Sequence, residues 1–411
     1  MGAGILIAGA RRDKARWRSL AATEANSHSG GPRAGALAFG RPPHNLTPRS
    51  AIQRSPADIR TNNFDVLRLL AAIQVVVVHA MDHLRPAGLP APSWQWFLEA
   101  FPGVPIFFAI SGFLISLSYE RSADVKTYTQ NRALRILPGL WACFFVSVAS
   151  VALLAPQVLH VGVRQLAPWA VAQLTLGQFY NPSWLRGYGV GVLNGSLWTI
   201  PVELQFYAVL PVIYLALGLR HRRGNAGLLA LLAAFWGVNR VFVHLDAADS
   251  AQLWYKLWGV SFLPYIYLFI AGVLLQRNWT RVAGWFAGRW LPWLATYVLV
   301  AFALHAVGWV VGTNHPTPLS VPFLLAVVFS AAYSAPSLAD RLLRRNDISY
   351  GTYIYHMPVV NAFIVLGIAD TAGAIGLILG VTLLLAAASW RLVERPALRK
   401  KRQTLHATSA P

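Results

Sequence analysis

The chain has 411 residues, of which 56% are hydrophobic and only 12% charged, and it carries a formal net charge of +20. A soluble domain cannot bury so large an apolar fraction in one core, which excludes an ordinary soluble globular protein. The composition instead predicts an all-α, polytopic membrane protein surrounded by the lipid bilayer.

Apolar runs long enough to cross a bilayer recur along the chain after residue 60. A hydrocarbon layer of roughly 30 Å needs about 20 apolar residues per helix. Runs of this size lie at approximately 64–84, 97–117, 136–156, 196–218, 226–244, 257–275, 290–311, 319–337, 348–367 and 373–393. We therefore expect about ten transmembrane helices.

The basic residues alternate between successive loops. Most of the 35 Lys and Arg residues lie in the two termini and in every second loop, and the remaining loops hold only Arg85, Arg164, Arg186, Arg240 and Lys256. Under the positive-inside rule, both termini and the basic loops are cytoplasmic. This distribution accounts for the positive charge without a nucleic-acid partner.

The two ends of the chain differ in composition from the part between them. Residues 1–60 are rich in Arg, Ala, Gly, Pro and Ser, which predicts a disordered, basic cytoplasmic tail. Residues 61–398 form one predicted membrane domain, and residues 399–411 form a cytoplasmic C-terminal tail.

The first apolar run, "FDVLRLLAAIQVVVVHA", contains two ionisable side chains, Arg68 and His79. Their separation of 11 residues brings them to within about 20° of the same helix face and about 16 Å apart along the axis. Ionisable groups inside a membrane helix are costly and mark candidate functional sites. The alternative is a lipid-phosphate or capping role for Arg68 and a hydrogen-bonded, structural His79.

The next two runs have further unusual features. "FPGVPIFFAISGFLIS", with Ser111 and Gly112, indicates an irregular or closely packed helix. "QNRALRILPGLW" contains Arg132 and Arg135 at a cytoplasmic helix start. These arginines either follow from the positive-inside bias or bind an anionic, phosphate-bearing ligand, for which the guanidinium group is well suited.

The longest predicted external segment, 158–195, is rich in Gly, Asn and aromatic residues near its end. Tyr180, Trp184 and Tyr188 are candidates for a flat platform under a sugar ring. The alternative is an aromatic belt at the level of the lipid headgroups.

"SLWTIPVELQFYAVLP" places Ser196, Thr199, Glu203 and Tyr207 on one helix face. The carboxylate of Glu203 must be neutralised, hydrogen-bonded or hydrated inside a span, and a histidine from a neighbouring helix is a natural partner.

A third polar face lies in "ISYGTYIYHMP", where Ser349, Thr352 or Tyr353, and His356 come together. A helix-to-helix hydrogen bond that only fixes packing is the alternative to a functional His356. No third ligand accompanies the i, i+4 pair of His79 and His83, so we predict no metal site.

These segments together resemble, in order, the motifs of the membrane acyltransferase-3 family of O-acyltransferases. "FDVLRLLAAIQVVVVHA" is similar to the family's Arg/Lys-x10-His signature, and "GVPIFFAISGFLIS" to its Ser-Gly-Phe pattern. The remaining matches are "NRALRILPGLW", "SLWTIPVELQFYAVLP", "SYGTYIYHMP" and the closing "WRLVERPALR". The resemblance covers roughly residues 62–398, without an appended esterase-like domain.

The resemblance implies a membrane-bound enzyme of the bacterial inner membrane that transfers an acyl group, most often acetyl, from cytoplasmic acyl-CoA to a sugar hydroxyl. The acceptor is expected in an envelope or exported polysaccharide, such as O-antigen or exopolysaccharide. Acyl-CoA is then a co-substrate, and no permanently bound cofactor is expected. A small glycosylated metabolite is an alternative acceptor, and a transporter or flippase of a lipid-linked or anionic molecule is an alternative of another class.

In this interpretation Arg68, Arg132 and Arg135 hold the phosphates of acyl-CoA. His79 acts as general base or carries the acyl group itself, Glu203 orients it, and His356 contributes to the oxyanion or to positioning the acceptor. The expected supporting or acceptor-binding residues are Ser111, Ser196, Trp198, Tyr207 and Tyr353.

Overall fold

The computed structural model describes residues 62–86, 88–219, 224–249, 252–309, 314–335, 338–344, 346–368 and 372–399. The predicted N-terminal tail and nearly all of the predicted C-terminal tail lie outside these residues. Within them the secondary structure is helical and no strand occurs, in agreement with the predicted all-α class.

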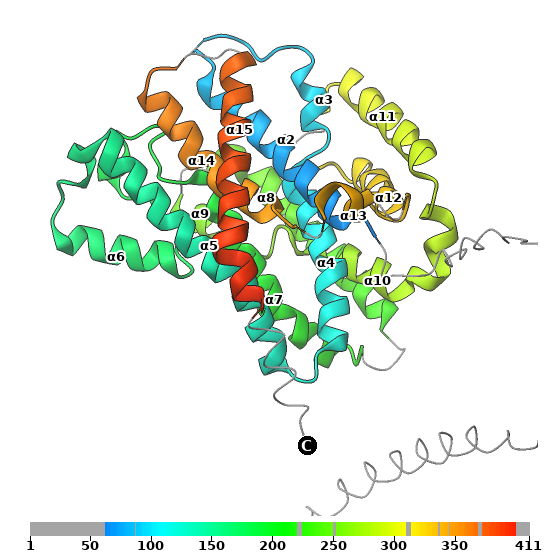
Figure 1. Cartoon of the computed structure of the whole chain (residues 1–411). Coiled ribbons are helices and arrows are strands. Elements are labelled where there is room, and N and C mark those ends of the chain that lie inside the picture. The colour runs from blue at the N-terminus through cyan, green and yellow to red at the C-terminus, as the bar shows by residue number, and fades with distance from the viewer. Residues whose placement is uncertain are drawn as a thin grey trace, which may run out of the picture. The chain divides into compact units, whose positions relative to one another are not determined.

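The helices follow one another with short connections (Figure 1). The longer ones are α2 (Phe64–Leu84), α4 (Gly103–Arg121), α5 (Val125–Leu154), α6 (Val163–Leu174), α7 (Thr199–Ala216), α8 (Asn225–Asp249), α10 (Ile266–Phe286), α11 (Trp290–Ala306), α12 (Ser320–Ala332), α14 (Ser349–Val365) and α15 (Ala372–Ser389). The short ones are α3 (Gln95–Glu99), α9 (Leu253–Gly259), α13 (Leu338–Leu343), the 3-10 turns Pro156–Leu159, Ser183–Leu185 and Gly195–Trp198, and the π-helical turn Trp390–Glu394.

Each predicted apolar run contains a helix, but the helices differ in their ability to cross a bilayer. Six in the described residues are long and apolar enough to span one. Helices α10 and α11 would add a seventh if they form one span bent by 94°, with Gly288 at positive φ in the break. Helix α12 has only 13 residues. The chain is therefore a multi-pass membrane protein, and the count of ten spans stays a prediction.

Two boundaries differ markedly from the apolar runs. Helix α5 begins at Val125, well before the predicted start at 136, because its first turns carry Lys126, Arg132 and Arg135, which a search for apolar residues passes over. Helix α10 begins at Ile266 instead of 257, because the chain turns at residues 260–265 after the short α9.

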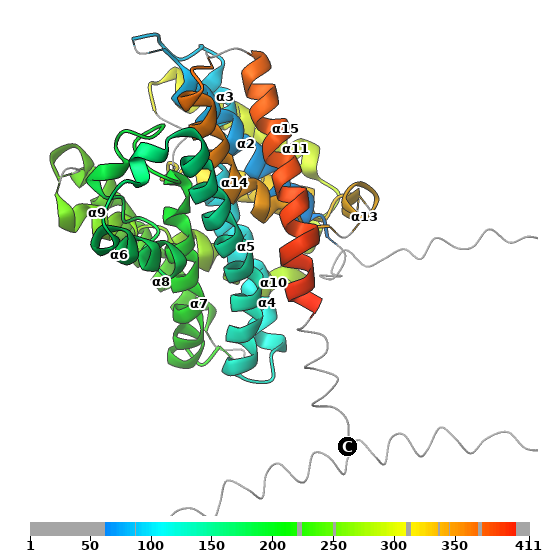
Figure 2. The same cartoon turned by 60° about the vertical axis from the view of Figure 1, so that its left-hand side comes forward.

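Helices α2, α14 and α15 pack side by side, although α14 and α15 lie almost 300 residues after α2 (Figures 1 and 2). Helix α4 packs on α10 with unusually close backbones. A Cβ on Gly112 would lie 1.9 Å from the carbonyl oxygen of Phe269, and a Cβ on Gly272 would lie 2.1 Å from that of Ala109. This confirms the close packing predicted for the Ser-Gly-Phe segment. The same helix stays regular at Pro105, since the first turn needs no backbone N–H there.

Candidate active site

Two histidines from opposite ends of the sequence meet where α2 packs on α14. The Nδ1 of His79 lies 2.9 Å from the Nε2 of His356. The Nδ1 of His356 lies 2.6 Å from the carbonyl oxygen of Tyr353, one turn earlier on α14. His356 is fully buried, whereas His79 is partly exposed.

This chain of contacts fixes which nitrogen carries each hydrogen. A carbonyl oxygen only accepts, so the Nδ1–H of His356 donates to Tyr353 and its Nε2 is left as an acceptor. His79 must then donate through its Nδ1–H. The Nε2 of His79 keeps a lone pair, which makes this nitrogen a base and nucleophile.

His79 lines a cavity of about 240 Å³. Gln74 and Val78 of α2, Glu99 of α3 and Gly103 of α4 are among its other lining residues. The exposed side chains of Asp82 and Asn314 line it as well. The cavity therefore reaches the surface at the end of α2 that the charge distribution predicts to be external.

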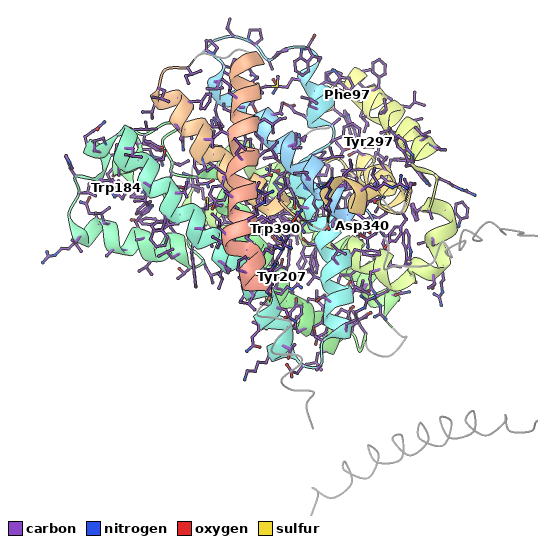
Figure 3. The ribbon with its side chains drawn as sticks, viewed as in Figure 1. Phe97, Trp184, Tyr207, Tyr297, Asp340 and Trp390 are labelled. Carbon is purple, nitrogen blue, oxygen red and sulfur yellow. The ribbon has the colours of Figure 1, made fainter. Side chains whose placement is uncertain are left out.

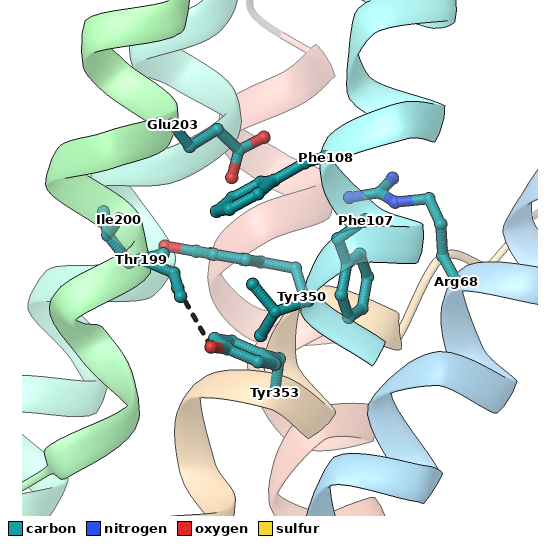
Figure 4. Close-up of a pocket in the computed structure, with 9 residues that line it drawn as sticks. Arg68, Phe107, Phe108, Thr199, Ile200, Glu203, Tyr350 and Tyr353 are labelled. Carbon is teal, nitrogen blue, oxygen red and sulfur yellow. Dashed lines mark hydrogen bonds between the residues drawn. The ribbon is translucent and has the colours of Figure 1, made fainter. Parts of the chain in front are cut away.

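A second, narrower space of about 30 Å³ begins where the first one ends. Val104 and Tyr353 line both. Figure 4 shows this narrow space, with the rings of Phe107, Phe108 and Tyr350 closing around it and Arg68 and Glu203 at its edge. The two spaces are neighbours and lie between Arg68, near the start of α2, and His79, and we call them together the route.

Glu203 lies on α7 beside the narrow space and does not contact His79 in the network described above. The hydroxyl of Tyr207 donates a hydrogen bond to its Oε1, and the hydroxyl of Ser111 donates another over 3.3 Å. The sequence interpretation paired Glu203 with a histidine, and the structure instead gives His79 the partner His356. Helical periodicity identifies the face of α7 that carries Glu203 but not the helix opposite that face.

Arg68 and Arg135 converge on one carboxylate at the start of α14. The Nη1 of Arg68 lies 2.9 Å from Oδ2 of Asp347, and Nη2 of Arg135 donates to the same oxygen. Burial alone would raise the pKa of Asp347, but the guanidinium groups of Arg135 and Arg68 outweigh it and hold this pKa well below its ordinary range. These three side chains together carry one net positive charge, and the carboxyl groups of Asp65 and Glu394 are also close enough to interact with Arg135.

Arg132, the third predicted phosphate ligand, lies apart from that cluster. Its Nη2 donates to the hydroxyl of Ser118 over 3.3 Å, and its guanidinium carbon lies 5.9 Å from the ring centre of Tyr207. The structure thus brings two of the three predicted arginines together.

The remaining predicted residues lie where the start of α7 and the turn before it meet the two spaces. The hydroxyl of Tyr353 donates to the carbonyl oxygen of Ser196 over 3.1 Å and accepts from the hydroxyl of Thr199 over 2.9 Å (Figure 4). The Ser196 hydroxyl itself donates to Asn194. Trp198 lines the outer cavity with its ring 5.2 Å from that of Tyr265.

The aromatic residues of the external segment do not share one exposed surface. Tyr188 is buried and its hydroxyl lies 3.2 Å from that of Ser150. Trp184 packs edge-on against Trp169 of α6, on the side of the molecule where α5 and α6 lie (Figure 3). Only Tyr180 of the three is well exposed. The sugar platform proposed from the sequence is therefore wrong for the buried Tyr188, and for the half-buried Trp184 it stays a prediction.

Sequence reasoning did not single out two acidic residues of this region. Asp347 joins the arginines, and it directly precedes the "ISYGTYIYHMP" segment, which was the available signal. Glu394 is almost fully buried in the π-helical turn after α15 and accepts from the Ser389 hydroxyl. It belongs to the closing "WRLVERPALR" segment, and π-helical turns often occur at functional sites.

Comparison with known proteins relates this geometry to a family. A family model for an acyltransferase domain, that of the acyltransferase-3 family, matches residues 61–391. Nodulation protein 10 of Rhizobium leguminosarum bv. viciae is 36% identical over 82% of the chain and 93% of its own length. An O-acetyl transferase of Shigella phage Sf6 is 26% identical over 83% of the chain and 97% of its own length.

A longer relative shares only part of its length with the chain. The peptidoglycan O-acetyltransferase OatA of Listeria monocytogenes is 23% identical over 72% of the chain and 49% of its own length. No solved structure matches. The family model covers most of the chain, and the helical membrane architecture agrees with it. The chain therefore belongs to the acyltransferase-3 family and is a membrane-bound O-acyltransferase.

Proposed function

We propose that this enzyme transfers an acetyl group from cytoplasmic acetyl-CoA to a hydroxyl of a sugar in an envelope or exported polysaccharide, at the bacterial inner membrane. The observation that carries the proposal is the Nε2 of His79, which has no hydrogen-bond partner among the described residues, on an imidazole that lines an outward cavity and is held there by the hydrogen bond to His356. Two relatives, the Shigella phage Sf6 and Listeria monocytogenes proteins, are named as O-acetyltransferases, which supports acetyl as the group transferred.

Acyl-CoA would enter at the opposite end of the route. Arg68 and Arg135 would bind its phosphates, since their cluster with Asp347 keeps a net positive charge. The distance along α2 from Arg68 to His79, about 16 Å, suits an extended pantetheine arm. The space between them, of about 30 Å³, holds about one water, so the aromatic side chains that line it would have to move to admit the arm. Closed around the arm, they would exclude bulk water from the thioester.

In direct transfer, Nε2 of His79 removes the proton from the acceptor hydroxyl while the hydroxyl oxygen bonds to the thioester carbonyl carbon. The carbon–sulfur bond then breaks, and the leaving CoA thiolate takes the proton from Nε2. His356 accepts the Nδ1–H bond throughout and so favours the positive charge that His79 carries between these steps.

An acyl-histidine intermediate would use the same nitrogen. Nε2 of His79 attacks the thioester carbonyl carbon, and CoA leaves as its thiolate. The sugar hydroxyl oxygen then attacks the acyl carbon, the carbon–nitrogen bond to the imidazole breaks, and the CoA thiolate takes the hydroxyl proton. Either course needs the acceptor and the thioester to reach His79 from opposite sides. The two neighbouring spaces support this, provided that the narrow one widens for the donor.

The acceptor would occupy the outer cavity. Asp82 and Glu99 offer carboxylate oxygens that accept hydrogen bonds from sugar hydroxyls, and Gln74 offers an amide. Trp198 supplies an apolar ring surface. Arg85 pairs with Asp82, so it is the carboxylate of Glu99 that disfavours an anionic acceptor by charge repulsion. A small glycosylated metabolite would use the same groups, so the acceptor has to be identified by assay.

The test is transfer of label from [acetyl-14C]acetyl-CoA to the envelope polysaccharide fraction by membranes that contain the wild type or His79→Ala at equal abundance. We expect label with the wild type and a loss of about 100-fold or more with the variant. Equal labelling by both would remove His79 from the mechanism. Absence of label with both would contradict acetyl-CoA as donor or polysaccharide as acceptor.

A further inference from the structure

An apolar groove on the side of the molecule is separate from the route between Arg68 and His79. It has a volume of about 530 Å³ and lies between α5, the end of α6 and α7. Leu137 and Trp141 of α5, Leu174 of α6 and Leu204 of α7 line it. The indole N–H of Trp141 donates to the carbonyl oxygen of Leu174 over 3.0 Å and holds the deep end of the groove together.

The opposite end of the groove is cationic. Arg132 lines it, and no carboxylate in the described residues lies within ion-pair distance of its guanidinium. The Nε of Arg132 is buried and has no hydrogen-bond partner among those residues. An unpaired buried donor of a charged group costs free energy, so a ligand that accepts a hydrogen bond there would be favoured.

The positions of Arg132 and Trp141 along α5 compare well with the depth of one bilayer leaflet. Helix α5 has 30 residues and is about 45 Å long, so several residues at each end extend past a hydrocarbon layer of roughly 30 Å. On a helix centred in this layer, Arg132, two turns from the start of α5, lies just inside the cytoplasmic edge of the hydrocarbon, from where its long side chain can reach the lipid phosphates. Trp141 lies nine residues deeper, about 14 Å along the axis, close to the half-thickness of the layer.

We propose that this groove binds one anionic phospholipid of the cytoplasmic leaflet, with its phosphodiester at Arg132 and one acyl chain along Leu137 and Trp141. The charge complementarity between Arg132 and a phosphate, at one end of an otherwise apolar surface, carries this proposal. The bound lipid would also touch the wall of the donor route, because Tyr207 lines the groove and donates to Glu203.

The experiment measures lipid binding to the delipidated, detergent-solubilised full chain by native mass spectrometry. The probes are dioleoyl phosphatidylglycerol, which is anionic, and dioleoyl phosphatidylcholine, which has no net charge. We expect the wild type to retain one phosphatidylglycerol at least tenfold more often than one phosphatidylcholine. Equal retention of the two lipids would overturn the proposal.

Two pairs of variants locate the site. Arg132→Gln should abolish the preference, whereas Lys126→Gln, which removes an exposed charge from the same helix end, should keep it. Ala208→Trp should block the lipid acyl chain from the groove and lower the retention of phosphatidylglycerol. Leu215→Trp, at an exposed position of α7 that does not line the groove, should leave that retention unchanged. A preference that survives Arg132→Gln or Ala208→Trp would place the lipid elsewhere. Since Ala208 is exposed, that variant tests the groove even if Arg132→Gln fails to fold.

A competition distinguishes the lipid from other phosphate-bearing ligands of Arg132. Glycerol 3-phosphate and acetyl-CoA at millimolar concentration should leave phosphatidylglycerol bound. Displacement by glycerol 3-phosphate would mean that the acyl chain of the lipid contributes nothing to binding. Displacement by acetyl-CoA would assign Arg132 to the donor site. Either displacement would overturn the proposal without affecting the role of His79.

Discussion

The two ends of the route through the protein use different chemistry. At the outer end, His79 and His356 form a hydrogen-bonded pair between two imidazoles, and no charge is needed to hold it. At the inner end, Arg68 and Arg135 are held by the ionised carboxylate of Asp347. The first arrangement leaves one nitrogen free to exchange a proton, and the second keeps a fixed charge. The comparison predicts that the proposed reaction and the proposed donor binding are separable by mutation.

The largest effect is expected from the outer pair. His356→Ala removes the acceptor that fixes the tautomer of His79, so kcat should fall by about 100-fold to 10,000-fold, while the KM for acetyl-CoA changes little. Initial rates of label transfer at varied acetyl-CoA measure both constants. His83→Ala, which removes an exposed histidine near His79, is the matched control. A retained kcat in His356→Ala would contradict the assignment of the tautomers.

Mutation at the inner end should change the KM for acetyl-CoA more than kcat. Arg135→Gln removes one charged phosphate ligand, so the KM for acetyl-CoA should rise by roughly 10-fold to 100-fold, while kcat at saturation changes less. Arg391→Gln removes an exposed arginine from the π-helical turn and should leave the KM unchanged. Equal changes for donor and acceptor would show that Arg135 acts on folding instead of on donor binding.

The carboxylate between the arginines should matter for stability. Asp347→Asn leaves two largely buried guanidinium groups without their shared partner, so we expect a loss of about 3 kcal/mol. The pKa of Asp347 is lowered on folding. The stabilisation is therefore fully present above the ordinary pKa near 3.8 and is lost as the pH falls below it.

Thermal unfolding in detergent checks both statements about Asp347. The wild type should keep its Tm from neutral pH down to about pH 4 as far as this group is concerned, and the difference from Asp347→Asn should shrink only at more acidic pH. A difference that disappears already between pH 7 and pH 5 would mean that Asp347 is not held ionised by the two arginines.

The sequence predicted which residues lie in this region better than it predicted which of them contact one another. Apolar runs located the helices, and the ordered motifs identified His79, His356 and Arg135. Periodicity along one helix could not tell which residue lies opposite, so the partner of His79 was assigned to Glu203 instead of His356. Asp347 escaped notice because it lies in a basic connection outside any apolar run, where a carboxylate carries no signal of burial.

The same reasoning explains why helix ends were the weaker part of the prediction. The start of α5 is helical through Lys126 and Arg132, in turns at or past the edge of the hydrocarbon. The number of consecutive apolar residues reflects the thickness of the hydrocarbon layer and not the full length of the helix. The apolar count therefore gave no sign that Arg132 lines an apolar groove beside α5. Arg135, one turn further along the same helix, does not line that groove.

The smallest effect is expected where the outer cavity meets water. Asp82 is well exposed and already accepts hydrogen bonds from Arg85 and Gln95. Asp82→Asn should raise the amount of polysaccharide acceptor needed for half-maximal transfer by only about 2-fold to 10-fold, the value of one hydrogen bond. The KM for acetyl-CoA should not change. Asp124→Asn, which removes a carboxylate at the other end of the bundle, is the control. A rise in the KM for acetyl-CoA instead would mean that the outer cavity belongs to the donor and would reverse the direction of the route.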